Sequence, residues 1–294
     1  MNPKLSVVVV VHDMRREAPR TLFSLSPGYQ RDVTAEQYEV IVIDNGSTSP
    51  LGAGEVERMA PNFRYHRHET SSSSPVEAVN LGVELARGDG VAICVDGARI
   101  LSPGVIHDML AAFRAFENPF IYTLGWHLGE EVQNISIAAG YDQIAEDRLL
   151  ESVDWRANGY ALFSISSLAL SCREGWFSTV AESNCFALRK SEFVRLGGFD
   201  DAFQEPGGGL VNLDFFSLAC GALELTPVLL LGEGTFHQFH GGVATNVEMT
   251  NHPWEKFHEE YVRVRGKPYA PPQFSPHYFG RLSPEARRFL PRKT

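Results

Sequence analysis

Residues 38–48 read Tyr-Glu-Val-Ile-Val-Ile-Asp-Asn-Gly-Ser-Thr, and this stretch decides the fold class. Its four consecutive branched aliphatic residues, 40–43, are typical of a strand that is buried on both faces of a parallel sheet. The strand ends at Asp44, and Asn-Gly then turns the chain. Ligands of open α/β sheets bind beyond the carboxyl ends of the strands, so Asp44 lies where a ligand would sit. The same residue types also suit a plain strand-terminating turn, and the stretch alone leaves both interpretations open.

The flanking sequence repeats this pattern through the first hundred residues. Apolar runs at 5–11 and 91–95 predict two more buried strands, and residues 63–66 fit a short one. Helical patterns at 16–25 and 75–85 separate the strands, the second opening at Pro75. This alternation predicts an α/β fold with a Rossmann-type, mostly parallel sheet flanked by helices.

The second half of the chain is less regular. We expect helices at 103–116 and 215–223, a short helix capped by Ser191, and strands at 120–124, 185–188 and 225–231. Residues 126–180 show no clear periodicity, and the chain after Pro268 is expected to be a surface tail. The predicted organisation is one domain over 1–250, with a nucleotide-binding half (1–100) and an acceptor half (101–250), followed by a C-terminal helix and tail (251–294).

Composition restricts the class of protein. The chain has 294 residues and a formal charge of −10, which argues against a nucleic-acid scaffold because such a protein needs a basic face. Its four cysteines show no Cys-x-x-Cys spacing, and the N-terminal apolar run is too short for a signal peptide or a membrane span. We therefore expect a reduced, cytoplasmic protein, with peripheral membrane attachment and a homodimer left open.

The order of these segments resembles the GT-A nucleotide-sugar glycosyltransferases, specifically the inverting family 2, over most of residues 4–245. The segment 6–13, Ser-Val-Val-Val-Val-Val-His-Asp, stands where the family has Ser-Val-Val-Ile-Pro-x-Tyr-Asn. The segment 42–48, Val-Ile-Asp-Asn-Gly-Ser-Thr, is similar to the family's Val-Val-Asp-Asp-Gly-Ser-Thr. Asn80 and Gly82 fit its Asn-x-Gly helix, and residues 197–200, Gly-Gly-Phe-Asp, fit its Gly-Gly-Phe-Asp-Glu segment.

The resemblance implies a donor site at the carboxyl ends of the first strands. In the family the first Asp of the second motif holds the nucleotide base, and Asp44 has that position. The donor is expected to be a nucleotide sugar, with UDP favoured, and the acceptor a saccharide or small molecule. The expected donor-binding residues are Val10, His12, Asp44, Asn45, Ser47, Asn80, Asp96, Gly97 and Arg99.

The resemblance also implies a divalent metal, Mn²⁺ or Mg²⁺, that acts as a Lewis acid on the leaving diphosphate. The family holds it with Asp-x-Asp, whereas here Asp96 is followed by Gly97 and then Ala98. His240, and next His237, are the candidate replacement ligands, and their alternative role is surface hydrogen bonding. Arg99 offers a fixed cation that could replace part of the metal's charge, or it forms an ion pair with Asp96 of little consequence.

A general base must take the proton of the acceptor hydroxyl. The family's usual base position falls on Asn212, which cannot serve, so Asp214 is the first candidate and Glu205 the second. The alternative role of Asp214 is to cap the following helix. Glu182 and three tryptophans (Trp126, Trp155 and Trp176) could line the acceptor side, although core packing is the commoner role of such aromatics.

The resulting hypothesis is a metal-assisted, inverting glycosyltransferase. Ala98 and Asn212 suggest one rival, a degenerate member that binds a nucleotide sugar without turnover. A nucleotidyltransferase is the weaker rival, because residues 12–16 lack the glycine-rich loop that usually follows its first strand.

Overall fold

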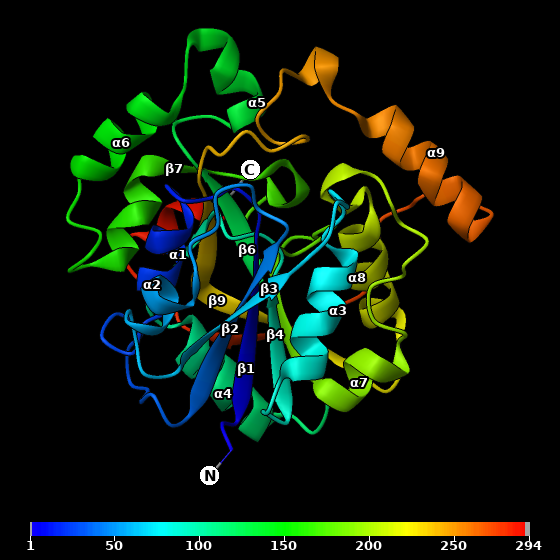
Figure 1. The fold of residues 1–294 in the computed structure, drawn as a ribbon, viewed down its shortest axis with the longest axis horizontal. Helices are drawn as coiled ribbons and strands as arrows, with labels where there is room; N and C mark the ends of the chain where they lie inside the picture. The colour runs from blue at the N-terminus through cyan, green and yellow to red at the C-terminus, as the bar shows by residue number, and fades with distance from the viewer. Residues whose placement is uncertain (1, 292–294) are drawn as a thin grey trace.

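The computed structural model describes residues 2–291 (Figure 1). In this part of the chain the strands form one ten-stranded sheet in the order β10-β9-β6-β8-β4-β1-β2-β3, with β5 beside β9 and β7 beside β6. The strands are β1 (Leu5–Val11), β2 (Tyr38–Asn45), β3 (Phe63–His68), β4 (Gly90–Cys94), β5 (Arg99–Leu101), β6 (Pro119–Leu128), β7 (Ser166–Leu168), β8 (Cys185–Arg189), β9 (Thr226–His237) and β10 (His277–Gly280). The α-helices are α1 (Ala18–Ser24), α2 (Ala53–Glu57), α3 (Val76–Leu85), α4 (Val105–Ala115), α5 (Gln133–Ser136), α6 (Gln143–Glu151), α7 (Lys190–Arg195), α8 (Val211–Gly221) and α9 (Trp254–Arg265).

The sheet is mostly parallel, as the sequence predicts. Strands β4, β1, β2 and β3 are parallel neighbours, and β6, β9 and β10 form a second parallel group. Strand β8 lies between the groups and is antiparallel to both β4 and β6. The two groups therefore run in the same direction, and their carboxyl ends meet at one edge of the sheet.

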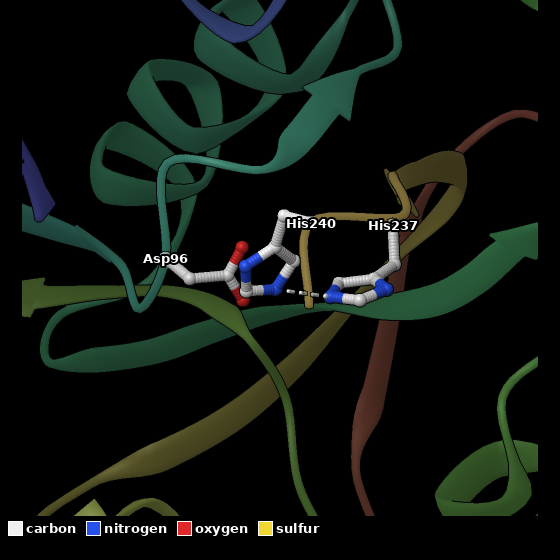
Figure 2. A group of neighbouring side chains, drawn as sticks. All are labelled: Asp96, His237 and His240. Atoms are coloured by element: carbon white, nitrogen blue, oxygen red, sulfur yellow. Dashed lines mark hydrogen bonds between the residues drawn. The ribbon is translucent and has the colours of Figure 1, made fainter. Parts of the chain in front are cut away.

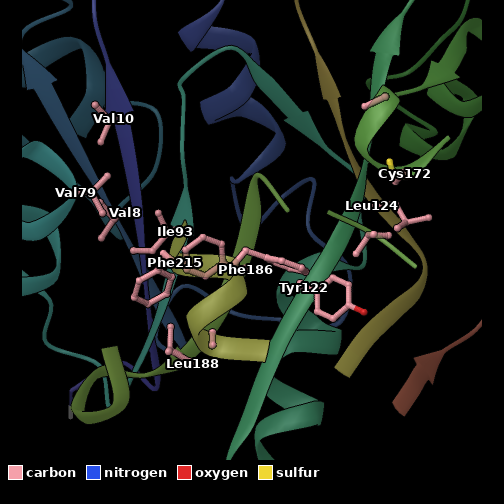
Figure 3. Packing of buried hydrophobic residues seen from close by; sticks show 14 of the residues in the cluster. Val8, Val10, Val79, Ile93, Tyr122, Leu124, Cys172, Phe186, Leu188 and Phe215 are labelled. Atoms are coloured by element: carbon pink, nitrogen blue, oxygen red, sulfur yellow. The ribbon is translucent and has the colours of Figure 1, made fainter. Parts of the chain in front are cut away.

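Helices cover both faces of the sheet, which explains the uninterrupted apolar runs of the central strands. Along β1, Val8 and Val10 belong to the same buried cluster as Val79 of α3 and Phe215 of α8 (Figure 3). The alternate residues of β1 face the other way and join the cluster that contains Leu22 of α1 and Met109 of α4. Side chains of one strand thus fill two cores.

Several predictions of local structure need correction. Strand β2 continues through Asp44 and Asn45, and β9 continues to His237, because both ends stay paired with a neighbouring strand. Ser191 does not cap a helix: α7 begins at Lys190, and its N-cap residue is Arg189. The predicted surface tail is largely exposed, but residues 277–280 form β10 and pair with β9.

Residues 126–180, which lack periodicity, contain two short helices, 3₁₀ turns and β7. Their order depends on aromatic packing, since Trp126 and Trp176 are fully buried with ring centroids 5.4 Å apart. Trp155 is also in the core, so the three tryptophans have the packing role rather than the acceptor-lining one. Among the described residues, no helix has both the length and the apolar character that a membrane span requires.

Candidate active site

The carboxyl edge of the sheet collects most of the polar residues singled out by the sequence. Asp44 is the penultimate residue of β2, Asp96 follows β4, and His237 ends β9. His127 lies near the end of β6, directly opposite His237 in the parallel register. Because all these strands run in the same direction, residues far apart in the sequence meet at this edge.

Asp96, His237 and His240 form one cluster (Figure 2). One ligand atom from each residue lies within 4.8 Å of the other two. The two Nε2 atoms of the histidines are 3.2 Å apart and form a hydrogen bond with each other (Figure 2). Two nitrogen ligands that each lie ~2.1 Å from one cation have about the same separation. The carboxylate and two imidazoles therefore fit a divalent transition metal, with the imidazoles favouring Mn²⁺ over Mg²⁺.

Burial lowers the pKa of both imidazoles in this cluster, which favours the neutral form that a metal ligand needs. Burial first, then the Arg99 guanidinium and the neighbouring imidazoles, hold the pKa of His237 well below its usual range. Burial also lowers the pKa of His240, and it lowers the pKa of His127 to about 3. A neutral imidazole has one ring nitrogen whose lone pair is available to a metal.

Gln133, at the start of α5, fixes the tautomer of His237. Its Oε1 lies 2.8 Å from His237 Nδ1 and accepts a second bond, also 2.8 Å, from Asn246 Nδ2. The oxygen can only accept, so Nδ1 carries the proton and Nε2 presents its lone pair to the cluster. Sequence reasoning missed Gln133, because a residue 104 positions away from His237 gives no local signal.

The loop that connects the two histidines to residues 241–246 is tightly bonded. The Asn246 side-chain oxygen accepts bonds from the backbone N–H groups of His240, Gly241 and Gly242, at 2.9–3.0 Å. The buried carboxylate of Glu146 accepts a 2.6 Å bond from the N–H of Phe239. Such bonds limit the positions that the His240 ring can reach.

Arg99 stands beside this cluster. Its Nε donates a 2.7 Å bond to Asp96 Oδ2, and its side chain is 5% exposed. Arg99 is paired with His237 across β5 and β9, so its position is set by the sheet rather than by a flexible loop. The pair is more buried than a surface ion pair, and it adds a fixed positive charge next to the cluster.

Ala98 cannot act as a ligand. Its side chain is fully buried, its N–H donates a 3.0 Å bond to Asp96 Oδ1, and its carbonyl accepts from the N–H of Gln238. The residue thus aims the Asp96 carboxylate and connects it to the segment between the two histidines.

The predicted base pocket centres on Asp44, whose side chain is fully buried. Its Oδ1 accepts a 2.9 Å bond from the N–H of Ser47, whereas Oδ2 has no hydrogen-bond partner among the described residues. The hydroxyl of Tyr65 on β3 is buried and unpartnered as well. Burial and the nearby Asp44 carboxylate raise the pKa of Tyr65, so its hydroxyl stays protonated.

The loops after β1 and β2 are joined next to this pocket. His12 Nδ1 lies 2.8 Å from the Asn45 carbonyl, and the N–H of Asp13 donates a 2.8 Å bond to Ser47 Oγ. The Asn45 side chain donates to the carbonyl of Ser74 at 3.1 Å, which brings the serine-rich segment 71–74 over the same edge.

The other residues expected at the donor site differ in their surroundings. Val10 is buried within β1, and Gly97 packs so closely that an added Cβ would lie 2.4 Å from Val11. The Asn80 side chain bonds both the N–H and the carbonyl of Phe199 at 3.0 and 2.8 Å, which fastens α3 to the Gly-Gly-Phe-Asp segment. The donor role of all three stays a prediction.

The two candidate bases are both paired with cations. Asp214 lies in the first turn of α8 but is not its cap; it accepts two bonds from Arg265, at 2.8 and 2.5 Å. Glu205 forms a 2.6 Å ion pair with Lys256. Asn212, the residue at the family's base position, instead donates a 2.8 Å bond from Nδ2 to Glu182 Oε2.

Comparison with known proteins agrees with this architecture. Residues 6–168 match the model of Glycosyl transferase family 2. Among solved structures, S. aureus TarS 1–349 in complex with UDP-GlcNAc has a TM-score of 0.57 and 16% identity, over 89% of this chain and 65% of that one. Another structure of TarS 1–349 has a TM-score of 0.52 and 16% identity, covering 80% and 60% of the two chains.

A longer S. aureus TarS chain gives a TM-score of 0.55 and 15% identity, over 89% of this chain and 39% of that one. This chain thus spans less than two thirds of the length of each of these structures. Comparison with curated proteins gives no match.

The sheet and its flanking helices have the GT-A fold, which the solved TarS structures share. The family match covers more than half of the residues, and the chain belongs to glycosyl transferase family 2.

Proposed function

We propose that this protein transfers a sugar from a nucleotide-diphosphate sugar, with UDP favoured, to an acceptor hydroxyl with inversion at the anomeric carbon and with metal assistance. The observation that carries the proposal is the cluster of Asp96, His237 and His240, whose ligand atoms lie within 4.8 Å of one another at the carboxyl edge. This edge is where ligands of open α/β sheets bind. The TarS structure with UDP-GlcNAc bound supports the choice of a UDP-sugar donor.

Asp96, His237 and His240 are the residues that would hold the metal. When bound, a divalent ion supplies Lewis-acid stabilisation of the charge that grows on the leaving diphosphate. Arg99 adds a second positive charge at the same place, held by its 2.7 Å bond to Asp96. A fixed cation in a site that is partly shielded from water stabilises a developing anion without having to reorganise during the reaction.

Asp44 is proposed to bind the nucleotide base. Asp44 Oδ2 meets no hydrogen-bond partner at bonding distance among the described residues, and the Tyr65 hydroxyl is the donor close to the carboxylate. A ring N–H, such as that of uracil, would supply a second donor. Because Asp44 is fully buried, the base reaches it only when the covering side chains move aside.

A nucleotide-sugar-binding protein without turnover is the second candidate. It is favoured by Ala98 and Asn212, where carboxylates of the family pattern are absent. The two candidates agree on donor binding and differ only in whether the bond to the diphosphate is broken. A nucleotidyltransferase remains the weaker alternative, since the loop after β1 carries His12 and Asp13 in place of glycines.

Two measurements test the proposal. The first is calorimetric titration with UDP, with and without Mn²⁺, and the second is an assay of UDP release from UDP-GlcNAc. We expect Mn²⁺ to strengthen UDP binding at least tenfold, which corresponds to about 1.4 kcal/mol. Asp96→Ala should abolish both this enhancement and UDP release. Asp89→Ala is the matched control, because Asp89 precedes the same strand at the opposite end and its side chain is exposed.

Failure of UDP to bind in either condition contradicts the proposal. Tight, metal-dependent binding without any UDP release supports the non-catalytic candidate instead. Release of pyrophosphate from nucleoside triphosphates and sugar phosphates supports the nucleotidyltransferase.

A further inference from the structure

The carboxylates near the carboxyl edge differ in what neutralises them. Asp214 accepts two bonds from the Arg265 guanidinium, and Glu205 is paired with Lys256. Asp96 is bonded by Arg99. A carboxylate held by a cation is stabilised in its charged form and is a poor proton acceptor. A general base for the acceptor hydroxyl is therefore best sought among carboxylates that have no cationic partner.

Glu182 is such a carboxylate. It lies three residues before β8 and its side chain is half-buried. Its Oε2 accepts a 2.8 Å bond from the neutral Asn212 amide, and no Arg, Lys or His among residues 2–291 forms an ion pair with it. Glu182 thus keeps a defined position without an ion-pair partner among the described residues.

The strand register places Glu182 at the same edge as the metal cluster. Strand β8 is antiparallel to β4, with Cys185 opposite Cys94. The pairing extends one residue further, because the N–H of Val95 donates a 3.1 Å bond to the carbonyl of Asn184. The chain that leads into β8 therefore runs beside the chain that leads out of β4 to Asp96.

Asn212 fixes the carboxylate from the other side. Its Nδ2 donates to Glu182 Oε2 at 2.8 Å and to the carbonyl of Ser183 at 3.1 Å, and the residue is 7% exposed. The first turn of α8 thus presents an amide where the family pattern has a carboxylate, and that amide holds a carboxylate supplied by the neighbouring segment.

We propose that Glu182 is the general base of the transfer reaction and that Asn212 is its positioning residue, an inference that rests on the proposed function. The acceptor oxygen forms a bond to the anomeric carbon while its proton passes to the Glu182 carboxylate. The bond between the anomeric carbon and the phosphate oxygen breaks, and its electron pair leaves with the nucleoside diphosphate. Attack from the side opposite the leaving group inverts the anomeric carbon.

Release of UDP from UDP-GlcNAc, with water as the acceptor, tests this role in the full chain. Glu182→Gln keeps the shape and an oxygen that can accept from Asn212, but it cannot take a proton. We expect UDP release to fall about 10²–10⁴-fold, with the calorimetric affinity for UDP in the presence of Mn²⁺ unchanged. Glu174→Gln is the matched control, since Glu174 is exposed on a nearby turn and is paired only with its neighbour Arg173.

Two further measurements separate a base from a merely structural residue. Azide is a nucleophile that needs no base, because it has no proton to lose. Added azide should therefore restore UDP release by the Glu182→Ala variant, and the product should be a glycosyl azide with the inverted configuration. The exchanged pair Glu182→Gln/Asn212→Asp keeps the hydrogen bond in reverse and should recover part of the activity that Glu182→Gln loses.

A Glu182→Gln variant that retains more than one third of the wild-type rate, or that loses UDP affinity together with the rate, overturns the proposal. A wild-type protein that binds UDP but never releases it from UDP-GlcNAc refutes the proposed turnover itself and the base with it. The two failures are distinguishable, because only the second appears in the unmodified protein.

Discussion

The pairing of Asp214 with Arg265 yields a quantitative prediction for Arg265→Leu. Arg265 donates two bonds to Asp214 and a 2.7 Å bond to Asp200, while the Asp214 side chain is only 6% exposed. Removing one partner of a buried pair costs ~3–5 kcal/mol, because the remaining charge is left without compensation. The Arg265 side chain is 25% exposed, so water can reach part of the vacated space. We therefore expect the lower end, about 3 kcal/mol.

Urea unfolding measures this loss. With a slope of about 3 kcal/mol per molar urea, the midpoint should fall by about 1 M. Arg263→Leu is the control, since Arg263 lies on the same helix, is 68% exposed and approaches Glu260 only to 3.7 Å. Adding Asp214→Asn to Arg265→Leu should recover most of the stability, because no unpaired buried charge remains.

The same variants address the mechanism. If Asp214 is a structural anchor, Asp214→Asn keeps UDP release within a few-fold of the wild-type rate. A loss below 1 kcal/mol in Arg265→Leu refutes the structural reasoning. A hundredfold loss of UDP release in Asp214→Asn, with unfolding free energy and UDP affinity retained, would show that Asp214 is the base after all.

Three other changes test separate parts of the structure. Burial raises the pKa of Glu233 to about 7, above the ~4.5 expected in the unfolded chain, so the native state binds the proton more tightly. The free energy of unfolding should therefore fall by about 3 kcal/mol as the pH rises from 4.5 through 7. In urea unfolding, Glu233→Gln should flatten this pH dependence. Gly82→Ala places a Cβ 2.3 Å from Val8 Cγ1, and the overpacking should exceed the gain in helix propensity, for a net loss of ~1–2 kcal/mol in the same assay. Gln133→Leu removes the acceptor for His237 Nδ1 and should weaken Mn²⁺ binding about 10–100-fold by calorimetry.

The parts of the fold that the sequence predicts are those with strong local patterns. Strand β1 has the predicted bounds, because seven apolar or small residues buried on both faces leave no other interpretation. The helix over α3 was predicted to within one residue from its opening proline and its apolar spacing. The segment 126–180 could not be assigned, because its 3₁₀ turns and loops pack through aromatic contacts between residues far apart in the sequence rather than through a periodic pattern.

The sequence predicted those residues of the candidate site that lie at or just after the ends of recognisable strands. Asp96 and the two histidines were identified from the sequence, and the structure brings them together. Gln133 and His127 were missed, since a contact across 104 residues or a cross-strand register leaves no mark in a single sequence. The pairing of Asp214 with Arg265, 51 residues away, was missed for the same reason.

The two departures from the family pattern are alike: at each position a carboxylate is absent, and a polar side chain from a neighbouring element lies at the same place. At position 98 a carboxylate is absent, and the pairing of β5 with β9 places His237 opposite Arg99, beside Asp96. At position 212 a carboxylate is absent, and the amide in its place bonds the carboxylate of Glu182. A site that loses its function has no reason to keep complementary partners, and loss of a carboxylate alone leaves buried donors unpaired, at a cost of ~1–3 kcal/mol each. Here each missing carboxylate is matched by an imidazole or a carboxylate from a neighbouring element. The contact between Asn212 and Glu182 is the part of this complementarity that bears on the proposed turnover, because a protein that only binds its donor needs no base at this place.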